Sequence, residues 1–214
     1  MTKPRVLVSV PTGTGWIHKH VCMATDRLLA DQRYDITLIR PTHKPYENNQ
    51  HQIINDFMAG DFVWWLSIDD DNPPMRNPLD LIDLGKDIIG CPTPVWHYTG
   101  GANERPIYWN AYKKTPGGYT EWNPKDGLQR VDAVGTGCVL YSRRVFENKQ
   151  MRLGPFARKL NVDGTVDRGN DISFCERATE QGFEIWAHFD YPCMHFAELE
   201  LNEIVQAFKG LGIR

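Results

Sequence analysis

The sequence predicts an α/β fold with a mostly parallel sheet and helices on both of its faces. The chain has 214 residues, of which 41% are apolar, so one domain with a sizeable core can form. Over residues 1–90, strand-like and helix-like segments alternate, which is the pattern of a parallel sheet. The segment DFVWWLSI at 61–68 is almost continuously apolar. Such a run is typical of a central parallel strand that is buried on both faces.

The first three elements are predicted from residue type and turn signals. RVLVSV at 5–10 is rich in β-branched residues and runs into the turn sequence PTGTG at 11–15. A helix is expected over 17–30. YDITLIR at 34–40 alternates between apolar and polar residues, as a half-buried strand does, and stops at Pro41.

The next elements complete the alternation. A second helix is expected to be capped by Asn48 or Asn49, since a side-chain oxygen there accepts a free N–H of the first turn. Gly60 is expected to end this helix. A short helix is predicted to start at Asn77-Pro78, because proline is tolerated at the first helical position. A short strand follows at 87–90.

Beyond residue 90 the composition changes. Residues 91–133 are rich in proline, glycine and aromatic residues, which predicts a small β region. PGG at 116–118 is a hairpin-turn sequence. VDAVGTGCVLYS at 131–142 predicts a strand, a glycine bend and a second strand. The remaining expected elements are a helix from Asn170 or Asp171 to Gln181, a strand at 183–187 and a helix at 198–208.

The net charge of −3 conceals an uneven distribution. Residues 105–168, the basic segment, hold 12 basic and 6 acidic residues, whereas the residues on either side are net acidic. The whole chain therefore lacks the basic character of a nucleic-acid binder, but one face could meet a polyanion. An ordinary scatter of surface charge is the alternative.

The five cysteines are scattered and contain no C-x-x-C pair, which favours reduced thiols and a cytoplasmic protein. No apolar run is long enough to cross a bilayer, and the first residues show no signal-peptide pattern, so no membrane insertion is expected.

Three adjacent carboxylates, Asp69–Asp71, directly follow the apolar strand at 61–68. They repel one another unless a cation or strong donors lie nearby. Oxygen ligands suit a hard divalent ion such as Mg²⁺ or Mn²⁺. A solvated turn is the alternative, because Asp-Asn-Pro-Pro is also turn chemistry. The position favours the metal site, since ligands bind beyond the carboxyl ends of parallel strands.

Three further places are candidates for chemistry. His195 is either an additional ligand of that ion or an ordinary core histidine. Asp171, at the start of a helix, is either a general base held ionised by the helix dipole or a simple helix stabiliser. The bend at 135–137 either lets a ligand approach the main chain or is a bulge. A zinc site from Cys193, His188 and His195 is conceivable, but the spacing matches no compact zinc module.

The order of these segments resembles that of the GT-A-fold glycosyltransferases over most of the chain. The segments that carry the resemblance are VLVSVPT (6–12), WWLSIDDDNPP (64–74), AVGTGCVLYSRRVFE (133–147), GNDISFCERATEQGFEIWAHFD (169–190) and CMHF (193–196). The second is similar to the family's D-x-D motif, and the closest likeness is to compact, phage-type members with a family-2-like sequence. Two departures are Asn170, where an acid is common, and the sequence Arg-Pro-Thr after the second strand, where many uridine-binding members have Asp.

The resemblance implies a GT-A (Rossmann-like) fold over residues 1–214, with a nucleotide-binding half at 1–100 and an acceptor-binding half at 101–214. It implies metal-dependent, inverting transfer of a sugar from a nucleoside-diphosphate sugar, UDP-linked in our expectation, to an acceptor hydroxyl. Asp69, Asp71 and His195 would hold Mn²⁺ or Mg²⁺, and Asp171 would be the base. The residues expected to contact the donor are Pro11, Thr12, Asp69, Asp70, Gly135, Thr136 and Gly137.

Aromatic residues lie among the cations of the basic segment, which suits either a stacked sugar or a base extruded from DNA. The residues expected to contact the acceptor are Trp109, Tyr112, Trp122 and Arg168. The phage-type likeness makes 5-hydroxymethylpyrimidine in DNA the leading acceptor, with a glycan, protein or small-molecule hydroxyl as the alternative. A nucleotidyltransferase or a non-catalytic nucleotide-binding module is the alternative from another class. The loop at 11–15 has no basic residue, which disfavours the nucleotidyltransferase.

Overall fold

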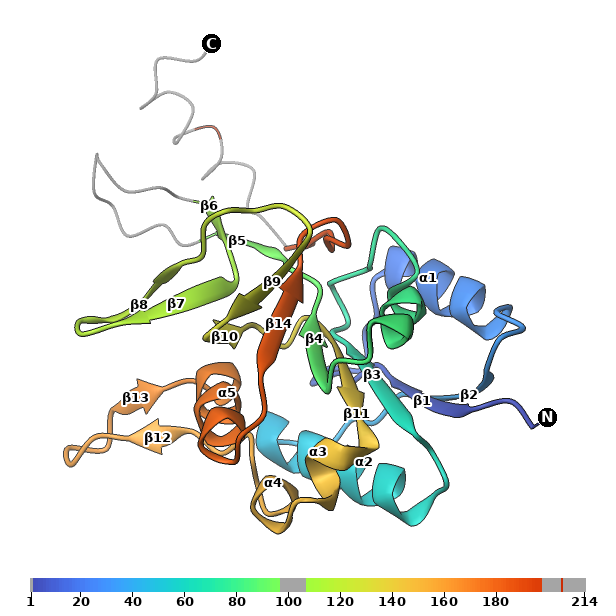
Figure 1. Cartoon of the computed structure of the whole chain (residues 1–214), viewed down its shortest axis with the longest axis horizontal. Coiled ribbons are helices and arrows are strands. Elements are labelled where there is room, and N and C mark those ends of the chain that lie inside the picture. Colours follow the sequence, from blue (N-terminus) through green and yellow to red (C-terminus); the bar gives the residue numbers. More distant parts are fainter. Residues whose placement is uncertain (1, 97–106, 198–204, 206–214) are drawn as a thin grey trace.

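A seven-stranded sheet forms the centre of the molecule (Figure 1). The structure, a computed structural model, describes residues 2–96, 107–197 and 205. The strand order is β2-β1-β3-β11-β4-β14-β9. The strands that share one direction are β1 (Arg5–Ser9), β2 (Asp35–Ile39), β3 (Trp64–Ile68), β4 (Ile88–Gly90) and β14 (Ile185–His188). The strands that run against them are β9 (Leu128–Val131) and β11 (Cys138–Ser142). The predicted α/β fold with a mostly parallel sheet is confirmed.

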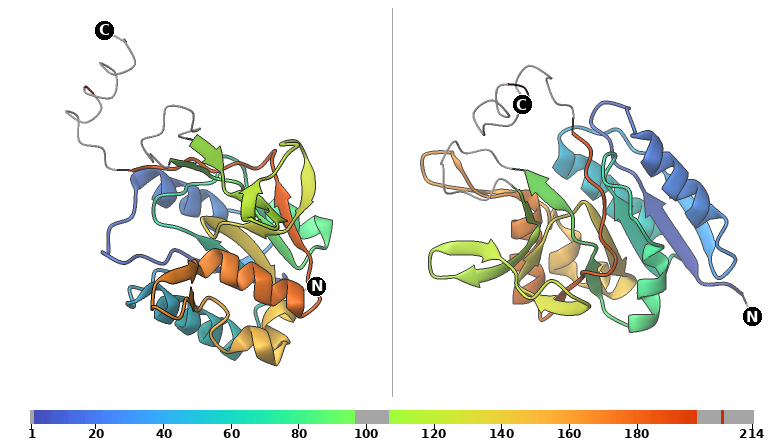
Figure 2. Two further views of the ribbon diagram at one scale, coloured as in Figure 1. Left: turned by 90° about the vertical axis from the view of Figure 1, so that its left-hand side faces the viewer. Right: turned by 90° about the horizontal axis from the view of Figure 1, so that it is seen from above.

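Helices cover both faces of this sheet (Figures 1 and 2). The helices of one face are α1 (Lys19–Leu29) and η1 (Pro78–Leu84), a 3₁₀ helix. The helices of the other face are α2 (Tyr46–Ala59), α3 (Arg143–Glu147), α4 (Lys149–Arg152) and α5 (Asn170–Glu180). The alternation of side chains along a strand separates the two cores, because Val6 and Val8 face α1 whereas Leu7 faces α2. Within the described residues, no helix has the length and apolar character needed to cross a membrane.

The start of α2 differs from the prediction. The helix begins at Tyr46, with Pro45 as its N-cap and no side-chain capping bond. Asn48 and Asn49 both lie inside the helix, so the prediction that one of them caps it is wrong. Asn49 is buried and its Nδ2 donates to the Pro41 carbonyl (3.1 Å), which anchors the helix to the loop after β2. The capping preference of asparagine is a local tendency, and here a tertiary contact replaces it.

The short helix agrees with its sequence signals, since Asn77 caps η1 and accepts the Leu79 N–H (3.0 Å). The turn at 116–118 joins a hairpin, as expected. The helix expected at 198–208 lies outside the described residues apart from Val205.

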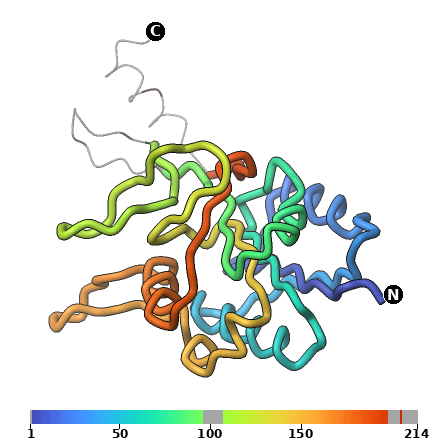
Figure 3. The backbone as a smooth tube through the Cα atoms, viewed as in Figure 1, coloured from blue at the N-terminus to red at the C-terminus, as the bar shows by residue number. Residues whose placement is uncertain are grey.

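The expected aromatic-rich β region is present as two small pieces. One is a three-stranded sheet of β10 (Ala133–Val134), β7 (Ala111–Thr115) and β8 (Gly118–Glu121). The other is the pair of β5 (Pro94–Trp96) with β6 (Ile107–Trp109). A further pair, β12 (Lys159–Leu160) with β13 (Val166–Arg168), lies beyond this region in the sequence. The β7–β8 and β12–β13 hairpins project from the side of the molecule that carries α5 (Figure 3). The rings of Tyr112, Tyr119 and Trp122 pack against the core beneath α2 and α5, which joins this region to the main sheet.

Candidate active site

The turn formed by Asp69–Asp71, which we call the acidic turn, lies where β3 ends at the carboxyl edge of the sheet. Three distant segments hold its backbone. The bonds are Asp69 N–H to the Gly137 carbonyl (2.8 Å), His18 N–H to the Asp70 carbonyl (2.8 Å) and Phe196 N–H to the Asp71 carbonyl (3.0 Å). The rings of His18 and Phe196 also stack, with centroids 3.7 Å apart. The turn is therefore fixed by the chain before α1, by the bend before β11 and by the segment after β14.

The glycines at 135 and 137 are required by the protein's own packing. A Cβ at Gly137 would overlap the side chain of Asn72, and a Cβ at Gly135 would overlap that of Asn110. Asn72 is buried and its Nδ2 donates to Asp71 Oδ1 (2.7 Å). Two asparagine side chains thus approach the main chain closely at this bend. Thr136 lies between the two glycines that they contact.

Asp69 is half-buried, and one of its carboxylate oxygens is enclosed. Its Oδ1 is inaccessible to solvent and has no hydrogen-bond partner among the described residues. Burial raises the pKa of Asp69 well above its usual range, and the carboxylates of Asp71, Asp70 and Asp171 raise that pKa further. Four carboxylates therefore lie within electrostatic range of one point, an arrangement that a cation would stabilise.

Asp71 and His195 face each other across the site. The Nε2 of His195 lies 3.5 Å from Asp71 Oδ2, and its Nδ1 lies 2.7 Å from the Pro94 carbonyl oxygen. Because a carbonyl oxygen only accepts, Nδ1 carries a hydrogen, and Nε2 is the ring nitrogen that faces Asp71. A backbone carbonyl commonly orients a metal-ligating histidine in this way.

No group of three His, Cys, Asp or Glu residues within the described part of the chain has the geometry of a metal site. The pair Asp71–His195 and the unpartnered Asp69 Oδ1 are nevertheless of the type that holds a hard divalent ion together with substrate oxygens. The zinc alternative is not supported, because the Cys193 thiol interacts with Cys91 and Cys138 whereas His195 faces Asp71.

Asp171 lies in the first turn of α5, after the N-cap Gly169. Its Oδ1 accepts the Ile172 N–H (2.7 Å), so one oxygen stabilises the start of the helix and Oδ2 remains for another partner. Burial raises the pKa of Asp171, with the backbone hydrogen bonds acting in the opposite direction. Burial thus outweighs the acidifying effect expected from the helix terminus, which makes this carboxylate a stronger base.

The loop after β1 is organised by Thr12. Its buried hydroxyl accepts the Gly15 N–H (3.1 Å) and donates to the Trp16 carbonyl (3.0 Å). Its N–H donates to the Pro41 carbonyl (3.1 Å), and Pro11 is buried beside it. Thr12 therefore shapes the loop with its own polar groups, and the loop joins the ends of β1 and β2.

The aromatic residues expected on the acceptor side are all half-buried. Tyr112 and Trp122 are half-buried against the core, and Trp109 N–H donates to Glu121 Oε1 (2.7 Å). Tyr112 forms an edge-on ring pair with Tyr108, at a centroid distance of 6.3 Å. Burial raises the pKa of both tyrosines and Asp171 raises it further, so these two rings lie near the proposed base.

Arg168, the fourth residue expected to contact the acceptor, is engaged in ion pairs. Its Nη1 contacts Asp167 Oδ1 (2.7 Å), and its Nε lies 3.8 Å from Glu176 Oε1. Within the described residues it is thus engaged with carboxylates.

Glu176 is a central residue that the sequence did not reveal. Its side chain is 10% exposed and accepts bonds from Lys159 Nζ (2.7 Å), Lys114 Nζ (3.0 Å) and the Tyr119 hydroxyl (3.1 Å). Burial alone would raise the pKa of Glu176, but these donors lower it to about 2. Glu176 therefore joins both projecting hairpins to α5. Its only sequence signal is a single acid after Phe174-Cys175, which says nothing about partners from two other segments.

The basic segment does not present a continuous cationic surface. Eight of its cations pair with carboxylates: Lys114, Lys125, Arg130, Arg143, Arg144, Arg158, Lys159 and Arg168. Several of the acids lie outside the segment, as Glu47, Asp87 and Glu176 do. The fold places those acids beside the cations of the basic segment. The charge count along the sequence therefore overstated the free positive charge.

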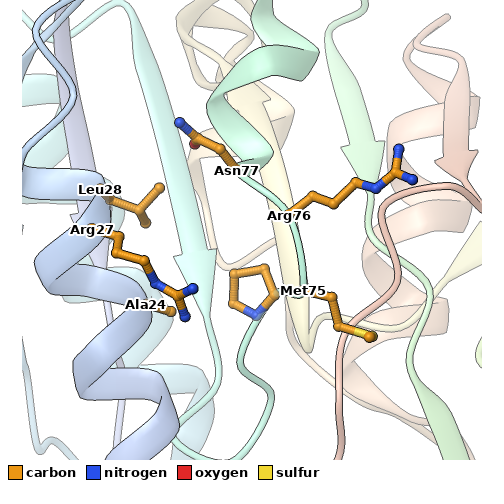
Figure 4. A pocket seen from close by; sticks show the side chains of 7 residues that line it. Ala24, Arg27, Leu28, Met75, Arg76 and Asn77 are labelled. Carbon is orange, nitrogen blue, oxygen red and sulfur yellow. The ribbon is translucent and has the colours of Figure 1, made fainter.

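A separate surface cavity of about 110 Å³ lies between α1 and the chain that follows the acidic turn (Figure 4). Its lining includes Arg27, Leu28, Met75 and Asn77. The Arg27 guanidinium points toward Met75, whereas that of Arg76 points away (Figure 4). None of the site residues discussed above lines this cavity.

No protein-family model matches the chain, and no curated protein matches it in sequence. Solved structures do match. A197 from STIV superposes with a TM-score of 0.60 at 14% identity, over 91% of this chain and 86% of that chain. GalNAc-T7, solved with UDP, GalNAc and Mn²⁺, superposes with a TM-score of 0.53 at 10% identity, over 93% of this chain and 44% of that one. The chain has a Rossmann-like fold of GT-A type. At these identities the likeness establishes the GT-A-type fold alone.

Proposed function

We propose that this protein is a metal-dependent glycosyltransferase that moves a sugar from a UDP-linked donor to an acceptor hydroxyl with inversion. The observation that carries the proposal is the cluster of Asp69, Asp71, His195 and Asp171 at the carboxyl edge of a GT-A-type sheet. Within that fold, the sequence motifs favour a compact, family-2-like and phage-type member. Residues 1–100 would serve the nucleotide and residues 101–214 the acceptor, with the protein working in the cytoplasm.

The site residues fit a hard divalent ion. Asp71 and His195 would hold Mn²⁺ or Mg²⁺, with the unpartnered Oδ1 of Asp69 as a further oxygen ligand. When bound, such an ion supplies neutralisation of the charge that develops on the leaving diphosphate. Asp70, whose backbone carbonyl accepts the His18 N–H, would contact the donor from the same turn. The bend at 135–137 would support the donor from the other side of the acidic turn.

Asp171 would act as the general base. It would take the proton of the acceptor hydroxyl at Oδ2 while the acceptor oxygen forms its bond to the anomeric carbon. The bond from that carbon to the diphosphate oxygen breaks on the opposite face, so the configuration inverts. Burial of the Asp171 carboxylate favours this role, because it raises the pKa of the group toward neutral pH.

The acceptor would lie against Trp109, Tyr112 and Trp122. The sequence places 5-hydroxymethylpyrimidine in DNA first among acceptors, with a glycan, protein or small-molecule hydroxyl as the alternative. The ion pairs of the basic segment leave few cations for a DNA backbone, and Arg168 would have to exchange Asp167 for a phosphate.

The deciding experiment incubates the full chain and Mn²⁺ with UDP-glucose, UDP-galactose or UDP-GlcNAc and one of two acceptor sets. One set is DNA containing hydroxymethylated pyrimidines, and the other is a glycan mixture. We expect one acceptor set to gain the mass of one sugar, with release of UDP. Binding of the donors without transfer or hydrolysis would indicate a nucleotide-binding module instead. Release of pyrophosphate from a nucleoside triphosphate and a sugar phosphate would indicate a nucleotidyltransferase.

A further inference from the structure

The buried face of α2 changes from polar to apolar along the helix. Ile53, Ile54 and Phe57 occupy its later turns and belong to the core. The first turns place Tyr46 and Gln50 on that face instead, four residues apart and therefore neighbours. Gln50 is buried, and Tyr46 is half-buried at the site end. An amphipathic helix does not need polar residues on its inward face, so this pattern requires a separate reason.

The polar end of α2 is directed at the candidate site. The Tyr46 hydroxyl donates to Thr136 Oγ1 (3.1 Å), across 90 residues of chain. Thr136 lies in the bend that holds the Asp69 N–H, between the two glycines fixed by Asn72 and Asn110. The two hydroxyls are therefore set by a helix and by a pinned bend, which gives them a defined position.

Two buried polar atoms around this pair have no partner within the described residues. They are Asp69 Oδ1 and Asn49 Oδ1, whereas the Gln50 side chain interacts with the Tyr46 hydroxyl. Ser9 and Ser67 lie one layer below, on the α2 side of the sheet, where the Ser9 hydroxyl accepts the Trp65 indole N–H (2.8 Å). Buried polar groups in folded proteins are almost always hydrogen-bonded. The interior next to this end of α2 is therefore polar, unlike the apolar core beneath its later turns.

Tyr46 lies within electrostatic range of the two functional carboxylates. Burial raises the pKa of Tyr46 well above its usual range, and Asp69 and Asp171 each raise it further. The phenol therefore stays protonated at neutral pH and can donate. In the proposed reaction Asp69 lies on the diphosphate side of the donor, and Asp171 lies where the acceptor approaches the anomeric carbon. The Tyr46 hydroxyl is close to both carboxylates, so it would lie near the sugar that joins the diphosphate to the site of attack.

We propose that the Tyr46–Thr136 hydroxyl pair recognises the hydroxyl groups of the donor's sugar, with Gln50 behind it. This inference rests on the proposed function. The pair carries two hydroxyl protons, of which their mutual bond uses one. The remaining proton is available to a sugar oxygen, and the remaining lone pairs can accept from a sugar hydroxyl. Tyr46 is thus assigned a role in donor specificity that the sequence motifs did not indicate.

The test compares Tyr46→Phe with the wild-type protein by calorimetry in Mn²⁺, using UDP and then UDP-glucose, UDP-galactose and UDP-GlcNAc. The substitution keeps the ring and removes the hydroxyl. We expect the Kd for UDP to stay within about twofold, and the Kd for the preferred UDP-sugar to rise about tenfold, the effect of one lost hydrogen bond. Thr136→Val should act in the same direction. Tyr119→Phe, which removes a hydroxyl bonded to Glu176, is the matched control and should change neither Kd.

The outcomes separate this inference from the proposed function. An equal loss of affinity for UDP and for the UDP-sugar would show that the pair only supports the fold, and unchanged affinity for both would remove it from the site. Either result overturns the inference while leaving the transferase proposal intact. If the wild-type chain binds none of these nucleotides, the proposed function fails and this inference fails with it. If Tyr46→Phe does not fold, Thr136→Val provides the test. The change in its Kd for the UDP-sugar is then compared with the change in its Kd for UDP.

Discussion

The acidic turn and the basic segment are both rich in charge, but they differ in how far their charged groups are paired and buried. In the basic segment, eight cations each find a carboxylate at or near the surface. In the acidic turn, the half-buried Asp69 lies beside other carboxylates, and its enclosed Oδ1 has no partner within the described residues. Paired surface charges contribute little beyond local stability, whereas an uncompensated buried charge is costly and persists where function needs it. The comparison indicates that burial and pairing locate a site better than net charge does.

The largest effect should follow from Asp171→Asn. This substitution removes one of the carboxylates that act on Asp69 of the acidic turn. Losing a general base costs about 10² to 10⁴ in rate, so transfer should fall by about that factor while the Kd for UDP in Mn²⁺ stays close to wild type. Transfer is measured by the mass of the product. Glu180→Gln, an exposed acid at the other end of α5, is the control and should keep full activity. Full activity in Asp171→Asn would remove it as the base.

Asp71→Asn should produce the next largest effect. Its carboxylate faces His195 and would be lost as an ionic ligand, so Mn²⁺-dependent binding of UDP should weaken about tenfold or more. Calorimetry with and without Mn²⁺ measures this, and Asp83→Asn, an exposed acid in η1, is the control. Equal affinity for UDP with and without Mn²⁺ in the wild-type chain would argue against the metal.

Glu176→Gln should destabilise the fold by about 2 kcal/mol, because the neutral amide leaves Lys114 and Lys159 without their carboxylate. Urea unfolding at neutral pH measures the change in the free energy of unfolding. Glu180→Gln is again the matched control on the same helix and should change that free energy by less than about 0.5 kcal/mol. A change in Glu176→Gln as small as in the control would mean that Glu176 does not join the hairpins to α5.

The same carboxylate should make stability depend on pH. Its pKa is lowered from an ordinary 4.5 to about 2 in the folded chain, so the folded state favours the ionised form. The contribution of Glu176 is therefore complete above about pH 5 and is lost as the pH falls toward 2. The difference in the free energy of unfolding between wild type and Glu176→Gln should shrink over that range. A difference that is constant from pH 7 to pH 3 would contradict the assigned shift.

The smallest effect concerns the basic segment. Three of its cations, Lys113, Lys149 and Arg152, make no ion pair with a described residue. If DNA binds through such cations alone, the slope of log K against log salt should not exceed about 3 in magnitude. Fluorescence anisotropy with a labelled duplex at several salt concentrations measures the slope. A much steeper slope would mean that DNA opens the ion pairs, and it would favour a DNA acceptor.

The sequence by itself determined the alternation of elements, the buried central strand and the place of the acidic turn. These features are local, because the apolar run at 61–68 and the capping residues Asn77-Pro78 carry their information within a few neighbouring residues. The order of motifs along the chain was sufficient to indicate a GT-A-type fold. The cap of α2 was the local prediction that failed, since a contact between Asn49 and Pro41 replaced it.

Only the tertiary structure decided which distant groups meet. It placed His195 beside Asp71, Tyr46 against Thr136 and both projecting hairpins on Glu176. These pairs depend on strand order, above all on the insertion of β11 between β3 and β4, which carries the bend at 135–137 to the acidic turn. Strand order is set by the burial of whole faces against one another, and that quantity is a property of the folded chain as a whole.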